Sequence, residues 1–200
     1  MRAAIGAAPL LAIPRAGHAQ PVSEGYPAKP IRFILGYAPG GSSDTVARTF
    51  GQKMHERMGQ PVVVDFRPGG NTVIAAEILT RAAPDGYSLL LVLNTHAINP
   101  LLMKLPYDPI KDFAPVAPIG ISPYMLAAHP ALPAGNLKDL IAHARARPGA
   151  LNFSSSGSGG LGHLSGELFN QLTGVRIQHV PFKGGGPSVV ALLSGEVQMS

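Results

Sequence analysis

Short apolar runs alternate with segments of helical periodicity along most of the chain, and this alternation limits the fold more than any other feature. The segments "IRFILGY", "VVVDF" and "YSLLLVL" have the length of strands. After the first of them, Val46, Phe50, Met54 and Met58 recur at every fourth position, which predicts one apolar helix face. Strands and helices that alternate this often predict an α/β fold, with a mostly parallel sheet flanked by helices on both sides.

The second half of the chain repeats this rhythm. Apolar residues at helical spacing predict helices over residues 137–147 and 161–173 and around residues 189–193, with a strand "VRIQHV" before the last of them. In the first half of the chain, the unbroken apolar character of "YSLLLVL" predicts a strand that is buried on both faces. The apolar positions of the two longer helices are Leu137, Leu140, Ile141 and Ala144, and Leu161, Leu164, Leu168 and Leu172.

A proline-rich segment, Pro100 to Pro123, interrupts the alternation and predicts a connection between two domains. We expect residues 20–121 to form the first lobe and residues 122–200 to form the second lobe. The final "GEVQMS" has the character of a strand that has just begun. The sequence therefore predicts a second lobe that is incomplete at its C-terminal end, with the chain a piece of a longer protein.

The first nineteen residues predict a secretory signal peptide. They combine an early arginine, the apolar run Ala3 to Ile13 and the small residues Gly17 and Ala19. The apolar run is too short to cross the ~30 Å hydrocarbon core of a bilayer as a helix. We expect residues 1–19 to be removed and the protein to be exported to a bacterial periplasm.

Composition excludes several classes of function. The formal net charge is +5 without a run of basic residues, and aromatic residues are 6% of the chain, so a nucleic-acid interface is not expected. The chain has no cysteine and no H-x-x-x-H spacing, so we expect no metal site. No G-x-S-x-G motif is present, and the serines of residues 154–158 are interpreted as hydrogen-bond donors and caps rather than nucleophiles. We expect no catalytic residue and no cofactor.

The loops that follow strands are the expected ligand-binding elements of an open α/β sheet. Five of them carry glycine, serine or asparagine: "YAPGGSSD", "RPGGNT", "NTHAINP", "SSSGSGGLGH" and "PFKGGGPS". Glycine lets backbone N–H groups approach a ligand, and the helix that follows adds free donors and partial positive charge. These loops predict sites for an anion.

One of these loops places Gly157, Gly159 and Gly162 in the G-x-G-x-x-G spacing of dinucleotide-binding loops. A dinucleotide site also requires an acidic residue at the end of the next strand. That strand, "VRIQHV", has none, so an enzyme with a nucleotide cofactor is the weaker alternative.

Taken in order along the chain, several segments are similar to the solute-binding proteins of tripartite tricarboxylate transporters, the TctC or Bug family. The matching segments are "YPAKPIRFILGYAPGGSSDTVAR", "APDGYSLLL", "HAINPLL", "LNFSSSGSGGLGHLSGELF" and "HVPFKGGGPSVVALLSGEV". The resemblance implies a fold like periplasmic binding proteins of type II, in which two lobes close on a small carboxylate. It also implies membrane transporter subunits as partners. We expect the protein to be a monomer and, because no catalytic pattern is present, not to be an enzyme. The alternative partner for the same binding chemistry is a signalling receptor.

The resemblance implies that two loops hold the acid group of the ligand, one in each lobe. The family pattern also differs here in places: Phe66 replaces the usual Asn, Asn71-Thr72 replace further glycines, and Phe182 replaces a common Tyr. Asp44 and His163 each have an alternative interpretation, as a partner of a helix N-terminus and as a cap or packing residue. The expected ligand-binding residues are Tyr37, Ala38, Pro39, Gly40, Gly41, Ser42 and Asp44 in the first lobe, and Ser155, Ser156, Gly157, Ser158, Gly159 and His163 in the second.

Overall fold

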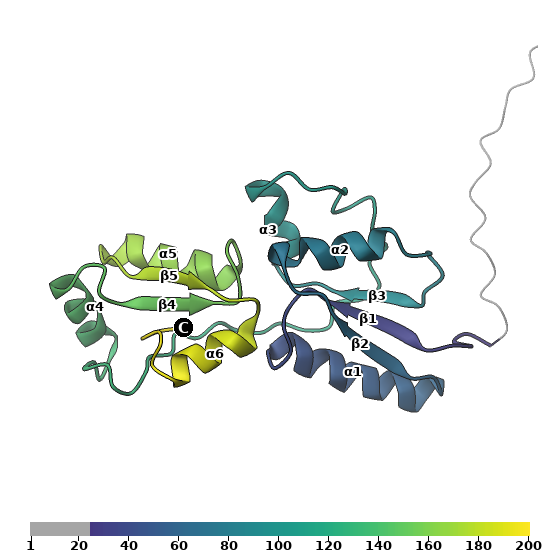
Figure 1. Ribbon diagram of the computed structural model, residues 1–200, viewed down its shortest axis with the longest axis horizontal. Helices are drawn as coiled ribbons and strands as arrows, with labels where there is room; N and C mark the ends of the chain where they lie inside the picture. Colours follow the sequence, from purple (N-terminus) through teal and green to yellow (C-terminus); the bar gives the residue numbers. More distant parts are fainter. Residues whose placement is uncertain (1–24) are drawn as a thin grey trace, which may run out of the picture.

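A computed structural model describes residues 25–200, in which the strands form two separate parallel sheets (Figure 1). The predicted signal peptide therefore lies outside the described residues. The first sheet has the order β2-β1-β3 and the second has the order β4-β5. We call each sheet with its helices a lobe. The strands are β1 (Ile31–Leu35), β2 (Val62–Phe66) and β3 (Ser88–Leu91) in the first lobe, and β4 (Asn152–Ser155) and β5 (Gln178–Pro181) in the second.

In the first lobe, α1 (Ser42–Met58) and α2 (Val73–Thr80) lie on opposite faces of the sheet (Figure 1). A short 3-10 turn, η1 (Gly70–Thr72), precedes α2. A further helix, α3 (Thr95–Leu102), covers residues that the sequence assigned to a loop, so this assignment is wrong. Its periodicity is hard to detect because the buried positions of α3, Thr95 and Asn99, are polar.

The apolar stripe of α1 is not its most buried face, which corrects the sequence interpretation. The buried residues are Ser43, Asp44, Ala47 and Gly51, whereas Phe50 is exposed. Small side chains let the helix axis approach the strand closely: a methyl group at Gly51 would come within 3.2 Å of Val62. Close packing through small residues therefore overrides the periodicity of the larger ones.

In the second lobe, α5 (Leu161–Thr173) and α6 (Gly185–Leu193) lie on opposite faces of the two-stranded sheet, and α4 (Leu137–Ala146) packs at its far end (Figure 1). The leucine stripe of α5 is exposed, contrary to expectation, and Leu172 is 77% exposed. The side of α5 that faces the sheet instead carries Gly166, which leaves room for the ring of Phe153. A glycine at the closest approach allows a large aromatic ring to fill the core between helix and sheet.

β3 is not buried on both faces, which is a second correction. It is the edge strand of the described sheet, and only Leu91 of its residues is buried. No helix or strand lies between Leu102 and Leu137, where the chain passes from one lobe to the other, as Figure 1 shows. The exact lobe boundary at residues 121/122 stays a prediction. Near residue 200 the chain pairs with β4, because Met199 bridges both Phe153 and Ala128.

Among the described residues, none of the helices has both the length and the apolar character that a membrane span requires.

Candidate functional site

The loop after β1 is held in shape by its own aspartate. Asp44 is buried; its Oδ2 accepts the N–H of Gly40 at 2.9 Å, and its Oδ1 is 2.5 Å from Arg48 Nε. Both carboxylate oxygens therefore have protein partners, which gives Asp44 a role in closing the loop. Gly41 precedes α1 and provides no side-chain cap, so the first N–H groups of the helix are left for another acceptor.

The loop between β5 and α6 lies directly against this first loop. Ala38 donates its N–H to Lys183 O at 2.8 Å, across the two lobes. A methyl group at Gly41 would lie 3.3 Å from the amide nitrogen of Gly186 and 3.4 Å from that of Gly185. The N-termini of α1 and α6 therefore meet, and neither helix has a side-chain cap.

Two uncapped helix N-termini that face each other concentrate partial positive charge and free N–H donors in one place. The partial positive charges of the two helix N-termini repel each other. An anion held between them offsets this repulsion and accepts hydrogen bonds from the free N–H groups. The residues 184–186 are absent from the predicted ligand-binding set, although the glycine triplet in "PFKGGGPS" was a visible indication. Backbone approach of this kind depends on which loops meet in space, and the sequence does not give that.

The Ser/Gly loop of the second lobe is built on a pair of stacked histidines. The rings of His163 and His179 lie 3.9 Å apart, centroid to centroid. His163 Nδ1 accepts the N–H of Gly159 at 2.9 Å, and His179 Nε2 is 2.7 Å from Ser155 Oγ. Ser155 Oγ also contacts the backbone of Gly157. The described contacts give His163 a structural role in this loop, and they use the Gly157 and Gly159 amides internally.

A third loop, after β2, also reaches the second lobe. Asn71 and Thr72 adopt left-handed conformations, with φ of 51° and 75°. Non-glycine residues in this region cost of order 1–3 kcal/mol each and persist where a function or the surroundings require them. A methyl group at Gly157 would come within 3.1 Å of Asn71 Oδ1, and one at Gly159 within 3.5 Å of Asn71 Nδ2. Asn71 therefore lies between the lobes. The sequence indicated its loop, "RPGGNT", as a candidate anion loop, but Asn71 is not among the expected ligand-binding residues.

Behind these loops the first lobe has a buried polar network. Tyr37 Oη is 2.7 Å from Thr95 Oγ1, and Thr95 Oγ1 is 3.4 Å from that of Thr72. Tyr37 and Thr95 are both buried. Burial raises the pKa of Tyr37 to about 12, and the hydrogen bond to Thr95 only partly offsets this effect. The phenol is therefore neutral at physiological pH and is used to position Thr95.

The two loops predicted to hold the ligand, residues 37–44 and 154–163, lie in the same region, but no hydrogen bond of the described residues joins them directly. The β5–α6 loop links them, because Gly41 lies against Gly186, and the carbonyl of Phe182 is 3.9 Å from a methyl group built at Gly157. Of the predicted residues, Pro39, Gly40, Ser42 and Ser158 are exposed, whereas Ala38, Ser156 and Gly157 are partly buried. The ligand contacts of all these residues stay a prediction.

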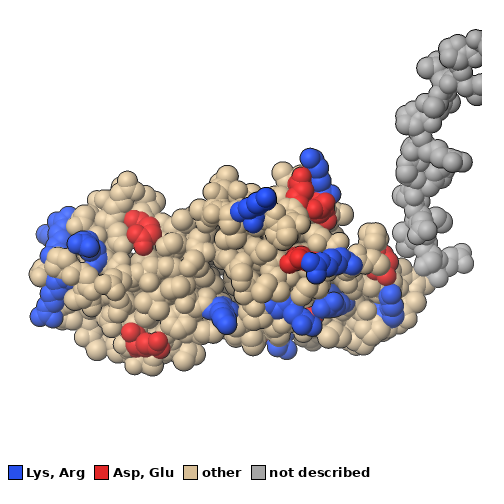
Figure 2. All heavy atoms as spheres, turned by 45° about the horizontal axis from the view of Figure 1, so that its top comes forward, with Lys and Arg blue, Asp and Glu red and all other residues tan. Residues whose placement is uncertain are grey.

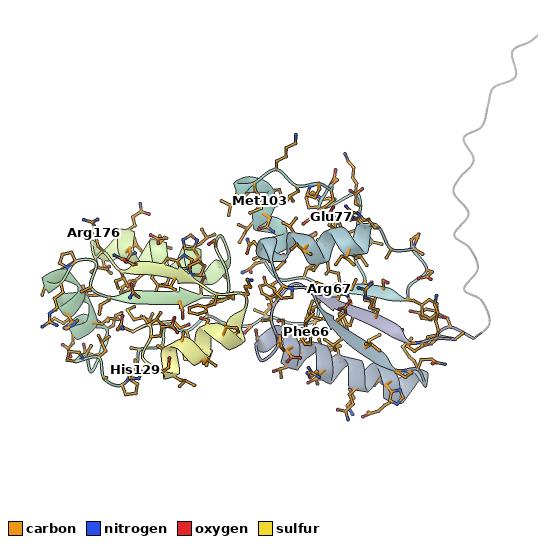
Figure 3. All side chains as sticks on the ribbon, in the orientation of Figure 1. Phe66, Arg67, Glu77, Met103, His129 and Arg176 are labelled. Carbon is orange, nitrogen blue, oxygen red and sulfur yellow. The ribbon has the colours of Figure 1, made fainter. Side chains whose placement is uncertain are left out.

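The basic side chains at the junction of the lobes have protein partners or point to solvent. Arg67, labelled in Figure 3 at the end of β2, pairs with Asp65 at 2.9 Å. Burial alone would raise the pKa of Asp65, but hydrogen bonds from Arg32 and Arg67 lower it below its usual value. In Figure 2, Lys and Arg gather at the end of the second lobe that is distant from the first. Within residues 25–200 no group of His, Asp or Glu could hold a metal ion.

Comparison with known proteins agrees with this architecture of two α/β units with facing loops. Residues 46–200 match the family model "Tripartite tricarboxylate transporter family receptor". BugT of Bordetella pertussis is 41% identical over 189 residues, which are 92% of this chain and 58% of BugT. The chain belongs to the tripartite tricarboxylate transporter receptor family, a family of receptors and not of enzymes.

Two solved structures place the fold in the same class. Rpa4515 of R. palustris with adipate is 36% identical with a TM-score of 0.84, and the match covers 87% of this chain and 59% of that one. MatC from Rhodopseudomonas palustris with bound malate is 35% identical with a TM-score of 0.79, and the match covers 87% and 60%. The chain thus spans less than two thirds of the length of these relatives. The predicted α/β fold of the periplasmic binding protein type is confirmed.

Acid is expected to destabilise the protein through His179. Burial and the adjacent His163 lower the pKa of His179 from 6.5 to about 4, although Glu167 opposes this shift. The unfolded chain therefore binds a proton at His179 as the pH falls below 6.5, whereas the folded protein does not until about pH 4. The contribution of neutral His179 to the free energy of unfolding is present in full above pH 6.5 and is lost as the pH falls from 6.5 to about 4.

Urea unfolding at a series of pH values measures this effect. His179→Asn should flatten the pH dependence between about pH 6.5 and about pH 4, whereas His55→Asn, at an exposed position of α1, should leave it unchanged. A wild-type stability that does not change across the window would contradict the assignment.

Proposed function

We propose that this protein is a periplasmic solute-binding receptor that captures a small carboxylate between its two lobes and delivers it to the membrane subunits of a tripartite tricarboxylate transporter. The family assignment supports the receptor role. The relatives with adipate and malate support a carboxylate as the ligand. The single observation that carries the proposal in this chain is the meeting of the uncapped N-termini of α1 and α6 at Gly41 and Gly185-Gly186.

Backbone groups alone are sufficient for such a site. A hydrogen bond to a charged group contributes about 1.5–3 kcal/mol, so four of them give roughly 6–12 kcal/mol. Association costs about 4 kcal/mol or more. The difference is compatible with micromolar binding, which corresponds to about −8 kcal/mol. A site that grips the acid through main-chain amides leaves the rest of the ligand to be selected by other residues.

Isothermal titration calorimetry of the full-length protein tests this proposal. The panel consists of mono-, di- and tricarboxylates, each paired with its neutral amide as a matched control. We expect at least one acid to bind with micromolar affinity and its amide to bind at least about tenfold more weakly, because the amide lacks the negative charge. Equal binding of acid and amide, or no binding of any acid, would contradict the proposal.

A further inference from the structure

The side chain of Asn71 presents a hydrogen-bond acceptor to the space between the lobes. Asn71 Oδ1 is a buried polar atom without a hydrogen-bond partner among the described residues. A methyl group at Gly157 of the opposite lobe would come within 3.1 Å of it, so the loop of the opposite lobe approaches this oxygen closely and a side chain at position 157 would cover it. Buried polar groups in native proteins have hydrogen-bond partners as a rule. An unpaired buried oxygen beside a predicted ligand loop therefore indicates that a ligand donates a hydrogen bond to it.

The orientation of this amide is fixed by its neighbour. Asn99 is fully buried, and its Nδ2 donates to the backbone carbonyl of Asn71 at 2.8 Å. A carbonyl only accepts hydrogen bonds, so Asn99 must place its nitrogen there and its Oδ1 toward the Asn71 side chain. Asn71 Nδ2 donates to that oxygen at 2.6 Å. The Asn71 amide therefore cannot be reversed, and the group it presents to the opposite lobe is an oxygen that accepts.

The backbone at this point is held in a conformation that asparagine tolerates and threonine disfavours. Asn71 and Thr72 are the only non-glycine residues with positive φ among residues 25–200. A strained pair at the contact between two lobes is typical of a residue whose side chain is needed where it lies. The hydrogen bonds to Asn99 place the Asn71 oxygen.

The groups around Asn71 Oδ1 favour a neutral hydrogen-bond donor over a cationic one. The side chains that hydrogen-bond to those of Asn71 and its neighbour Thr72 are Asn99 and Thr95, which carry no charge. A buried ammonium group without a carboxylate partner loses much hydration energy, whereas a hydroxyl group needs only one acceptor. The carboxylate of a ligand is itself an acceptor and is repelled by an amide oxygen.

We propose that Asn71 selects organic acids that carry a hydroxyl group, with Asn71 Oδ1 accepting the hydroxyl proton and Asn99 acting as its positioning residue. This inference rests on the proposed function, since it adds a second contact to the same carboxylate site. The ligand class is therefore the hydroxy acids. The site discriminates against the same acids without the hydroxyl, which leave the buried oxygen without a partner.

Calorimetry on the full-length protein with matched acid pairs tests this inference. The pairs are malate and succinate, lactate and propionate, and citrate and tricarballylate, which differ only in the hydroxyl. We expect the wild-type protein to prefer the hydroxy acid of a binding pair by about tenfold. Asn71→Gly should reduce this ratio to about one. Thr72→Gly, which removes the side chain of the adjacent residue whose backbone is also left-handed, should keep the ratio. Because the two affinities are measured on the same sample, their ratio does not depend on the folded fraction of a variant.

The outcomes separate this inference from the proposed function. If the unsubstituted acids bind as well as their hydroxy partners, the carboxylate receptor stands and the role of Asn71 is wrong. If Asn71→Gly keeps the wild-type ratio, selection by this oxygen is also wrong. If none of these six acids binds but another carboxylate of the broader panel does, the carboxylate receptor stands and the hydroxy-acid class is wrong. If no carboxylate binds at all, the proposed function and the inference both fail. Should Asn71→Gly not fold, the wild-type ratio alone decides.

Discussion

Replacing Gly186 by alanine is expected to weaken ligand binding by at least about tenfold while leaving the fold of each lobe intact. The new methyl group would lie 2.5 Å from the carbonyl oxygen of Pro39 and 3.1 Å from the carbonyl carbon of Gly40. Those atoms belong to the backbone of the opposite lobe and cannot rotate away as a side chain does. The lobes must therefore separate, which opens the site between the N-termini of α1 and α6.

Gly185→Ala provides the matched control for this prediction. Gly185 is the adjacent residue in the first turn of α6, and a methyl group there would lie 3.7 Å from Gly41, an ordinary van der Waals contact. Neither glycine has a positive φ, so alanine is compatible with the backbone at both positions. Calorimetry with the acid that binds the wild-type protein should show a large loss for Gly186→Ala and a change of less than about threefold for Gly185→Ala. Similar affinities of the two variants would show that the observed approach of the lobes is not the binding-competent arrangement.

Much of the fold followed from the sequence because strand and helix periodicity is a local property. The strands at Ile31–Leu35 and Val62–Phe66 and the helices at Ser42–Met58 and Leu161–Thr173 lie where the apolar patterns predicted them. Burial was predicted less well. The leucine stripe of α5 is exposed while Gly166 faces the core, because close backbone approach favours the smallest residue and periodicity counts only the large ones.

The sequence indicated some of the loops that meet at the candidate site, but not all of them. Glycine and serine before helices are typical of anion-binding loops, so "YAPGGSSD" and "SSSGSGGLGH" were selected from the sequence alone, and their ligand contacts stay a prediction. The contact of Gly186 with Pro39 and the orphaned oxygen of Asn71 depend on which loops of different lobes meet. That information lies in the packing of residues distant in sequence, and a single sequence does not contain it.

Phe153→Ala is expected to lower the free energy of unfolding of the second lobe by about 3–5 kcal/mol, the usual cost of removing a buried aromatic ring. Phe153 is 5% exposed and lies in the core cluster with Leu151, Ile177 and Met199. It also contacts the ring of His179, at 5.0 Å between centroids. The change thus leaves a cavity under the strand that carries the Ser/Gly loop, and urea unfolding followed by circular dichroism measures the loss.

The effect of Gly166→Ala on the free energy of unfolding should have opposite signs in the wild-type protein and in the Phe153→Ala variant. In the wild-type protein the new methyl group would overlap the Phe153 ring, and overpacking of this kind costs about 1–3 kcal/mol. Alanine inside a helix gains only about 0.5–1 kcal/mol over glycine, so the variant should be less stable than the wild type. Without the ring, the clash is absent and the helical gain remains. Gly166→Ala should therefore stabilise Phe153→Ala, and the four proteins of this double-mutant cycle yield the coupling between the two positions. An equal loss in both backgrounds would mean that Gly166 is required for a reason other than the ring of Phe153.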